Sequence, residues 1–202
     1  MRHLVLVLML ILFAANTAAQ EQTLLKSEEG WGGFGAAVIK VTSIKDHSAI
    51  MFGGRGGWVI NHSLLIGGGL YSIVSKVDAE KGVLPFEEAP LNVDLSYFGL
   101  EAEYIIRPAD IWHYSGYIFI GAGSTRYVKD TGTTFKSSEQ SGESDIVFVT
   151  EPSVNAELNI TAWFHLDAGL SYRLVTGVNR PGLENNDLSG ITGTLTFKFG
   201  KF

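Results

Sequence analysis

The chain contains no cysteine, so no disulfide can stabilise the fold and no cysteine is present for lipid attachment after export. Cysteine usage therefore gives no information about the redox compartment. The formal net charge is −6, which argues against a nucleic-acid-binding surface. Beyond the amino terminus, no apolar run approaches the roughly 18 residues of a membrane helix. If this chain enters a membrane, it enters as strands.

The amino terminus has the three features of an export signal. Met1-Arg2-His3 is positively charged, Leu4 to Phe13 is an unbroken apolar run, and Thr17-Ala18-Ala19 supplies small residues for cleavage. Such a segment is too short and wrongly flanked for a transmembrane helix. We expect residues 1–20 to be a signal peptide, residues 21–30 a short periplasmic lead-in, and residues 31–202 a single domain.

The last segment of the chain alternates with a strict period of two. Its outward set is expected to be apolar and its inward set polar: Ile191, Gly193, Leu195, Phe197 and Phe199 against Thr192, Thr194, Thr196 and Lys198. A membrane-spanning β-strand needs this pattern, with lipid on one side and a polar lumen on the other. The terminal Phe202 falls out of phase. Either Phe199 is the last lipid-facing residue, or a bulge lies near Gly200.

The same period recurs in eight segments, each near or above the roughly 9–11 residues that cross a bilayer at a tilt. They are residues 33–44, 49–60, 63–77, 91–107, 113–128, 145–159, 164–178 and 190–202. Connections 61–62, 108–112 and 160–163 are short, whereas 78–90, 129–144 and 179–189 are long and polar. This alternation is typical of bacterial outer-membrane barrels. The short connection 45–48 is an exception, and the facing of segment 63–77 stays open.

Together, the export signal, the eight alternating segments and the terminal aromatic resemble the small bacterial outer-membrane β-barrels, the group that contains the OmpA transmembrane domain and OmpX. The resemblance covers nearly all of the mature chain and is architectural. It implies an all-β fold, an eight-stranded antiparallel up-and-down transmembrane β-barrel in the outer membrane. The implied partners are outer-membrane lipid, lipopolysaccharide and the barrel-assembly machinery, with no nucleic acid, no cofactor and a monomeric state.

A soluble periplasmic barrel of the lipocalin type is the alternative fold, because its strands also alternate but hide their apolar face inside. The positions of the aromatic residues favour the membrane barrel. Five of them lie beside the short connections, where an interfacial belt belongs: Trp58, Tyr104, Trp112, Trp163 and Phe164.

Charged residues on the polar faces define a candidate lumen cluster. Its members are Lys40, Arg55, Arg126, Arg173 and Lys198 with Glu101, Glu103, Glu151, Glu157 and Asp167, and His165 is expected opposite Glu157. An eight-stranded barrel is just wide enough for its side chains to fill it. An isolated buried charge costs several kcal/mol, so these groups must pair. We expect an ionic core that closes the barrel.

Arg55 lies in a glycine run and faces a second one across the 61–62 turn. That turn places Arg55 opposite Gly67, Gly68 or Gly69. A neighbour without a side chain leaves room for a guanidinium group in a crowded interior. A phosphate site is the weaker interpretation, because no helix follows the glycines.

No catalytic, cofactor-binding or metal-binding residue is assigned. Barrel enzymes that acylate or deacylate lipid A need a hydroxyl or polar activator close to a histidine. His165 and Ser171 share a strand face but would lie about 20 Å apart at ~3.3 Å per residue. A lipid A-modifying enzyme stays as an alternative.

The long polar connections predict a structural or surface-binding role, with an unknown ligand bound through the loops.

Overall fold

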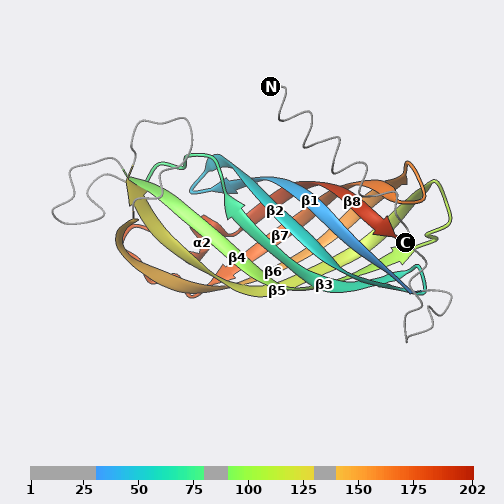
Figure 1. The fold of residues 1–202 in the computed structure, drawn as a ribbon. Coiled ribbons are helices and arrows are strands. Elements are labelled where there is room, and N and C mark those ends of the chain that lie inside the picture. The colour runs from blue at the N-terminus through green and yellow to red at the C-terminus, as the bar shows by residue number, and fades with distance from the viewer. Residues whose placement is uncertain (1–30, 80–90, 130–139) are drawn as a thin grey trace, which may run out of the picture.

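The computed structural model describes residues 31–79, 91–129 and 140–202, and these form a closed antiparallel barrel (Figure 1). Each strand pairs with its sequence neighbour, and β1 pairs with β8. The predicted fold class is therefore confirmed. The strands are β1 (Trp31–Ile44), β2 (His47–Ile60), β3 (Leu64–Ile73), β4 (Leu91–Ile106), β5 (Trp112–Lys129), β6 (Gln140–Asn159), β7 (Phe164–Thr176) and β8 (Gly190–Lys201), with the short helix α2 (Asn185–Leu188) before β8.

The barrel has two different ends. We call the end with the β2–β3, β4–β5 and β6–β7 connections the turn end, and the opposite end, which carries α2, the loop end (Figure 1). The carboxyl terminus lies at the turn end, where Gly33 of β1 pairs with Lys201 of β8. In the described part of the chain, no helix is long and apolar enough to span a membrane. The predicted signal peptide and lead-in lie outside the described residues.

The largest differences between the predicted segments and the structure lie at the loop end. β3 stops at Ile73, and Val77 to Ala79 runs beside β4 instead, with Asp78 bridged to Asn92. β6 begins at Gln140, five residues earlier than predicted. The 179–189 connection contains α2, whose last residue Leu188 is buried in the barrel. The residues at this end are mostly polar, so the sequence pattern did not predict the longer β6 or the helix α2.

Successive residues of each strand point alternately to the lumen and to the outside. Large apolar side chains cover the outside, including Leu100, Ile146 and Val154, which are 76%, 72% and 69% exposed. Arg173 and Lys198 are completely buried inside. This arrangement is the reverse of a soluble ligand-binding barrel and matches a membrane barrel. The aromatic side chains near the turn end also face outward: Trp58, Tyr104, Trp112 and Trp163.

The structure also determines the facing of β3, which the sequence left open. Leu65, Tyr71 and Ile73 point inward and are almost fully buried, whereas Ile66 and Leu70 are exposed. Strand pairing explains this facing. Ile66 lies opposite Trp58 of β2, which points outward, and directly paired residues of neighbouring strands point to the same side of the sheet.

Phe202 is out of phase with the outward aromatic residues because it points into the barrel. The β1–β8 register runs without a shift from Thr42↔Thr192 to Gly33↔Lys201, so there is no bulge near Gly200. Phe199 is therefore the last apolar residue that faces outward. Phe202 lies in phase with the lumen set and turns into the barrel, where its ring contacts His165.

The lumen is filled in three layers. Along β4, the inward residues run from apolar Ile105 at the turn end, through Glu103 and Glu101, to apolar Leu95 and Val93. A small apolar cluster therefore lies at the turn end and a larger one at the loop end. Charged residues occupy the layer between them.

Candidate functional site

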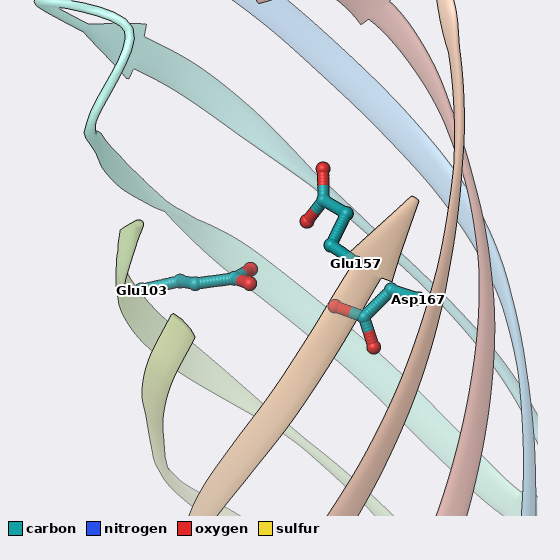
Figure 2. Close-up of side chains that lie close together, drawn as sticks. All are labelled: Glu103, Glu157 and Asp167. Carbon is teal, nitrogen blue, oxygen red and sulfur yellow. The ribbon is translucent and has the colours of Figure 1, made fainter. Parts of the chain in front are cut away.

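The centre of the charged layer is one ammonium group surrounded by three carboxylates. Lys198 Nζ lies 2.8 Å from Glu103 Oε1 and 3.0 Å from Asp167 Oδ2, and it also donates to Glu157. β4, β6 and β7 supply the carboxylates, which point toward one another across the lumen (Figure 2). Their oxygens lie within 4.8 Å of one another, a spacing that could hold a metal ion. The ammonium group of Lys198 takes that place.

Arg55 of β2 connects this cluster to a further carboxylate, Glu101. Its guanidinium group contacts Glu103, and its Nε lies 2.8 Å from Glu101 Oε1. Arg55 pairs with Gly69, one of the three glycines predicted to face it. A Cβ on Gly69 would lie 3.0 Å from Glu101 Oε2 and 2.9 Å from Tyr71 Oη, so this glycine leaves room for the charged pair.

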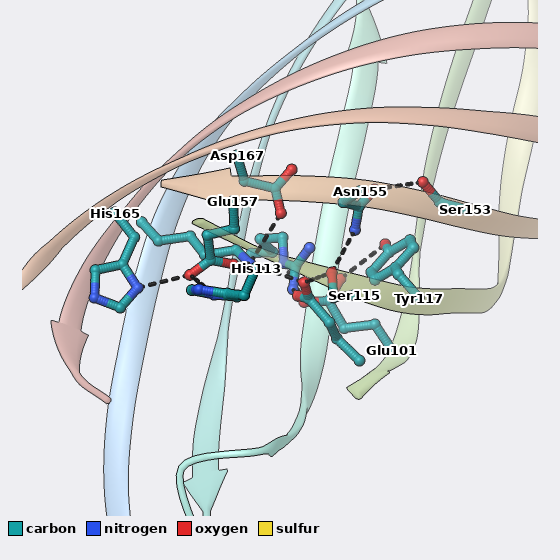
Figure 3. A network of polar contacts seen from close by, with 12 residues as sticks. Glu101, His113, Ser115, Tyr117, Ser153, Asn155, Glu157, His165 and Asp167 are labelled. Atoms are coloured by element: carbon teal, nitrogen blue, oxygen red, sulfur yellow. Dashed lines mark hydrogen bonds and ion pairs between the residues drawn. The ribbon is translucent and has the colours of Figure 1, made fainter. Parts of the chain in front are cut away.

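Hydroxyl and amide groups complete the hydrogen bonding around the charges (Figure 3). Ser115 Oγ donates to Glu103, and Asn155 Nδ2 donates to Ser115 at 3.1 Å. Tyr117 Oη donates to Glu101 Oε2 at 3.1 Å. Sequence reasoning missed these groups. They lie at alternate positions of β5 and β6, in phase with the other inward residues, and this period of two could have identified them.

A second ion pair lies toward the loop end. Lys40 Nζ is 2.8 Å from both oxygens of Glu151, which also accepts hydrogen bonds from Tyr97 Oη at 3.0 Å and Ser171 Oγ at 2.7 Å. The ammonium group lies 3.7 Å from the centre of the Tyr71 ring, a cation–π geometry. Each charge in this pair thus has several partners.

Two histidines share the turn-end side of Glu157. His165 Nδ1 lies 2.6 Å from Glu157 Oε1, and His113 Nε2 lies 3.4 Å from the same oxygen. The contact of His165 with Glu157 is diagonal, because the residue paired with His165 is Asn159. A cavity of about 510 Å³ opens at this end and is lined by both histidines and Phe202.

Two arginines differ from the prediction. Arg126 lies on the outer side of β5, where its Nε bonds Asp94 Oδ2 at 2.9 Å, because the inward positions here are Thr125 and Tyr127. Arg173 is inside the barrel but bonds carbonyl groups: its Nε donates to Leu188 O at 2.8 Å. The sequence pattern placed the Arg173 side chain in the lumen but did not predict that it would bind the backbone carbonyl of Leu188.

Little open space lies between the two groups of ion pairs. The cavity among Lys40, Arg55, Glu151 and Asp167 measures about 10 Å³, roughly the space that one water molecule needs. Ser171 is bonded to Glu151 and His165 to Glu157, so these two side chains belong to different clusters. The arrangement suits a plug better than a hydrolytic site.

Comparisons with known proteins identify the fold. No family model and no curated protein matches this chain. Neisserial surface protein A has a similar structure, with 17% identity, a TM-score of 0.50, and coverage of 86% of this chain and 97% of that one. The amino-terminal β-barrel domain of Pseudomonas aeruginosa OprF follows with 14% identity, TM-score 0.49, and coverage of 84% and 96%. Ail of Yersinia pestis has 14% identity, TM-score 0.44, and coverage of 86% and 98%.

These neighbours are small eight-stranded outer-membrane barrels. Their identities to this chain are all low, so the likeness concerns the fold and does not extend to ligands or activity.

Proposed function

We propose that this chain is a bacterial outer-membrane protein whose barrel is a closed scaffold, with a structural or surface-binding role rather than solute passage. The observation that carries the proposal is the filled lumen: Lys198 bridges three carboxylates, Arg55 bridges two, and the cavity between Arg55 and the Lys40–Glu151 pair measures only about 10 Å³. Apolar clusters cover this layer toward both ends. Barrels of this strand number rarely leave an aqueous channel.

The outer surface supports the location in the outer membrane. Each of the eight strands carries exposed apolar side chains, and exposed tryptophans lie at the turn-end border of this apolar belt. Short turns and the carboxyl terminus would then face the periplasm, and the loop end would face the outside. Residues 1–20 would be removed on export, and the barrel-assembly machinery and lipopolysaccharide would be its partners in the envelope.

A surface-binding role would use the loop end. A cavity of about 600 Å³ lies there, lined mainly by polar residues that include Asn179, Arg180 and Asn186. Its backbone is anchored: Lys45 Nζ donates to Gly182 O at 2.6 Å, and Arg180 lies over the ring of Tyr127. A polar pocket on a rigid support suits recognition.

Cell fractionation, gel mobility of cold and boiled samples, and planar-bilayer recording test the proposal. We expect an outer-membrane protein with heat-modifiable mobility and no stable conductance of porin size. Steady channels that pass small sugars would contradict the closed lumen, and recovery in the soluble periplasm would contradict the location.

Two further measurements test the surface-binding role and the lipid A-modifying alternative. The protein in nanodiscs is passed over a panel of immobilised surface glycans, with N179L/N186L as the matched variant. Binding that is lost in this variant supports the loop-end pocket. A change in the lipid A mass spectrum that depends on His165 would instead support the enzyme alternative.

A further inference from the structure

A groove crosses the outer surface of β3, β4, β5 and β6 toward the loop end. Its volume is about 640 Å³, and its lining is mostly apolar. Leu70, Phe98 and Ile146 are 63%, 68% and 72% exposed and form its raised walls. Small residues form its floor: Ser72, Ser96, Ala122, Gly123 and Ser124. We call this feature the outer groove. It continues the apolar belt, so its natural surroundings are lipid.

Three serines follow one another across the floor. Ser72 pairs with Ser96, and Ser96 pairs with Ser124, on adjacent strands. The hydroxyl groups of Ser72 and Ser96 share a hydrogen bond of 2.7 Å. Ser124 is half-buried, and its hydroxyl makes no hydrogen bond to the described residues. A hydroxyl group that faces hydrocarbon without a partner is unfavourable, so a polar group on the lipid would stabilise the Ser124 end of this row.

The position of the row indicates which part of a lipid it meets. On β4 and β5, the serine is the first polar outward side chain after the apolar belt toward the loop end; on β4, for example, Ser96 follows Phe98 and Leu100. Ser72 lies at the same level, although the exposed Val74 follows it. The next outward residues on β4 and β5 are Asp94 and Arg126, which pair with each other. These two charges neutralise each other, so a lipid beside the serines would be recognised by their hydroxyl groups and not by a charged side chain.

We propose that the outer groove is a binding site for a β-hydroxyacyl chain of a membrane glycolipid, the acyl chemistry of lipid A. Adjacent strands lie about 4.8 Å apart, so the carbonyl and the β-hydroxyl of one chain, two carbons from each other, can meet Ser96 and Ser124 together. The tail then lies between Phe98 and Ile146. An unsubstituted acyl chain offers the row its carbonyl alone. The site rests on the proposed membrane location.

Native mass spectrometry of the delipidated, refolded protein tests the proposal. The probes are two N-acylglucosamine lipids that differ only in the β-hydroxyl. One added hydrogen bond predicts about five-fold tighter binding of the hydroxylated lipid to the parent chain. S96A/S124A should bind both lipids equally, because it removes the hydroxyls and keeps the apolar walls. S124L should weaken both by filling the groove. T176A, which removes an outward hydroxyl elsewhere on the belt, is the matched control.

Each variant is first checked for heat-modifiable mobility, so that a folding failure is recognised; S96A alone then replaces a double variant that does not fold. Equal binding of the two lipids by the parent, or the same loss in T176A, would overturn the site. Dimers that disappear in S124L would assign the groove to self-association instead. An outer-membrane location with no lipid preference refutes only this inference, whereas a soluble location refutes the proposed function.

Discussion

The ring of the carboxyl-terminal Phe202 stacks on the imidazole of His165, with 3.8 Å between their centres and 22° between their planes. His165 in turn bonds Glu157, which accepts from Lys198. The last residue of the chain therefore covers the turn-end side of the charged layer. Because the charged layer depends on exclusion of water, this aromatic contact joins the chain terminus to the stability of the whole lumen.

Phe202→Ala should destabilise the barrel by about 1–3 kcal/mol, because it removes a half-buried ring and exposes the His165–Glu157 contact to water. Urea unfolding after refolding in detergent measures this loss without the assembly machinery. Phe202→Leu keeps an apolar cover and should recover part of it. Unchanged stability of Phe202→Ala would mean that the stacked ring adds nothing to the closure.

The period of two was sufficient to predict the fold and most of the lumen. It placed Lys40, Glu103 and Lys198 on inward faces. With lipid outside and polar groups inside, a shift of one residue would turn every polar side chain of a strand toward the lipid, so only one facing is possible. It could not assign Arg126, since polar residues occupy both faces beyond the membrane belt. It also could not predict which charges pair. Glu157 and Lys198 come from strands that are not neighbours, and their contact depends on the barrel curvature and on side-chain length.

Lys198→Met should destabilise the protein by about 3–5 kcal/mol, because three buried carboxylates then lose their shared cation. Their oxygens lie within 4.8 Å of one another, so the variant should gain a response to Ca²⁺, which prefers carboxylate ligands. Urea unfolding of the parent and the variant, with Ca²⁺ or with EDTA, measures both effects. The parent should show no difference between the two conditions.

Lys40→Met is the matched control for this experiment. It also removes a buried ammonium group but leaves one carboxylate, Glu151, with hydroxyl neighbours. It should lose stability and stay insensitive to Ca²⁺. An equal Ca²⁺ response in both variants would show that Ca²⁺ acts elsewhere on the protein.

Two glycines of β5 should differ sharply in their tolerance of alanine. A Cβ on Gly121 would overlap Phe98 O and lie 2.9 Å from Gly99 Cα, whereas a Cβ on Gly116 meets nothing within 4 Å. Gly121→Ala should therefore cost about 1–3 kcal/mol through overpacking. Gly116→Ala should be neutral or stabilise by about 0.5 kcal/mol. Urea unfolding in lipid bilayers compares them, and equal values would contradict the close β4–β5 approach.

Leu170→Arg tests the assignment of the lipid-facing surface. Leu170 is 57% exposed on β7, between the outward residues Val154 of β6 and Gly193 of β8. A charge on the lipid face near mid-strand should cost about 2–4 kcal/mol or block assembly.

Two loop-end substitutions calibrate that loss. Asn186→Ala, at an exposed position, should stay within about 0.5 kcal/mol. Asn185→Ala should cost about 1 kcal/mol, because Asn185 Oδ1 accepts from Val178 N at 2.9 Å. All three variants are compared by urea unfolding in bilayers together with heat-modifiable mobility. If Leu170→Arg is tolerated as well as Asn186→Ala, the surface at β7 is not in hydrocarbon, and the assignment of the lipid-facing surface is wrong.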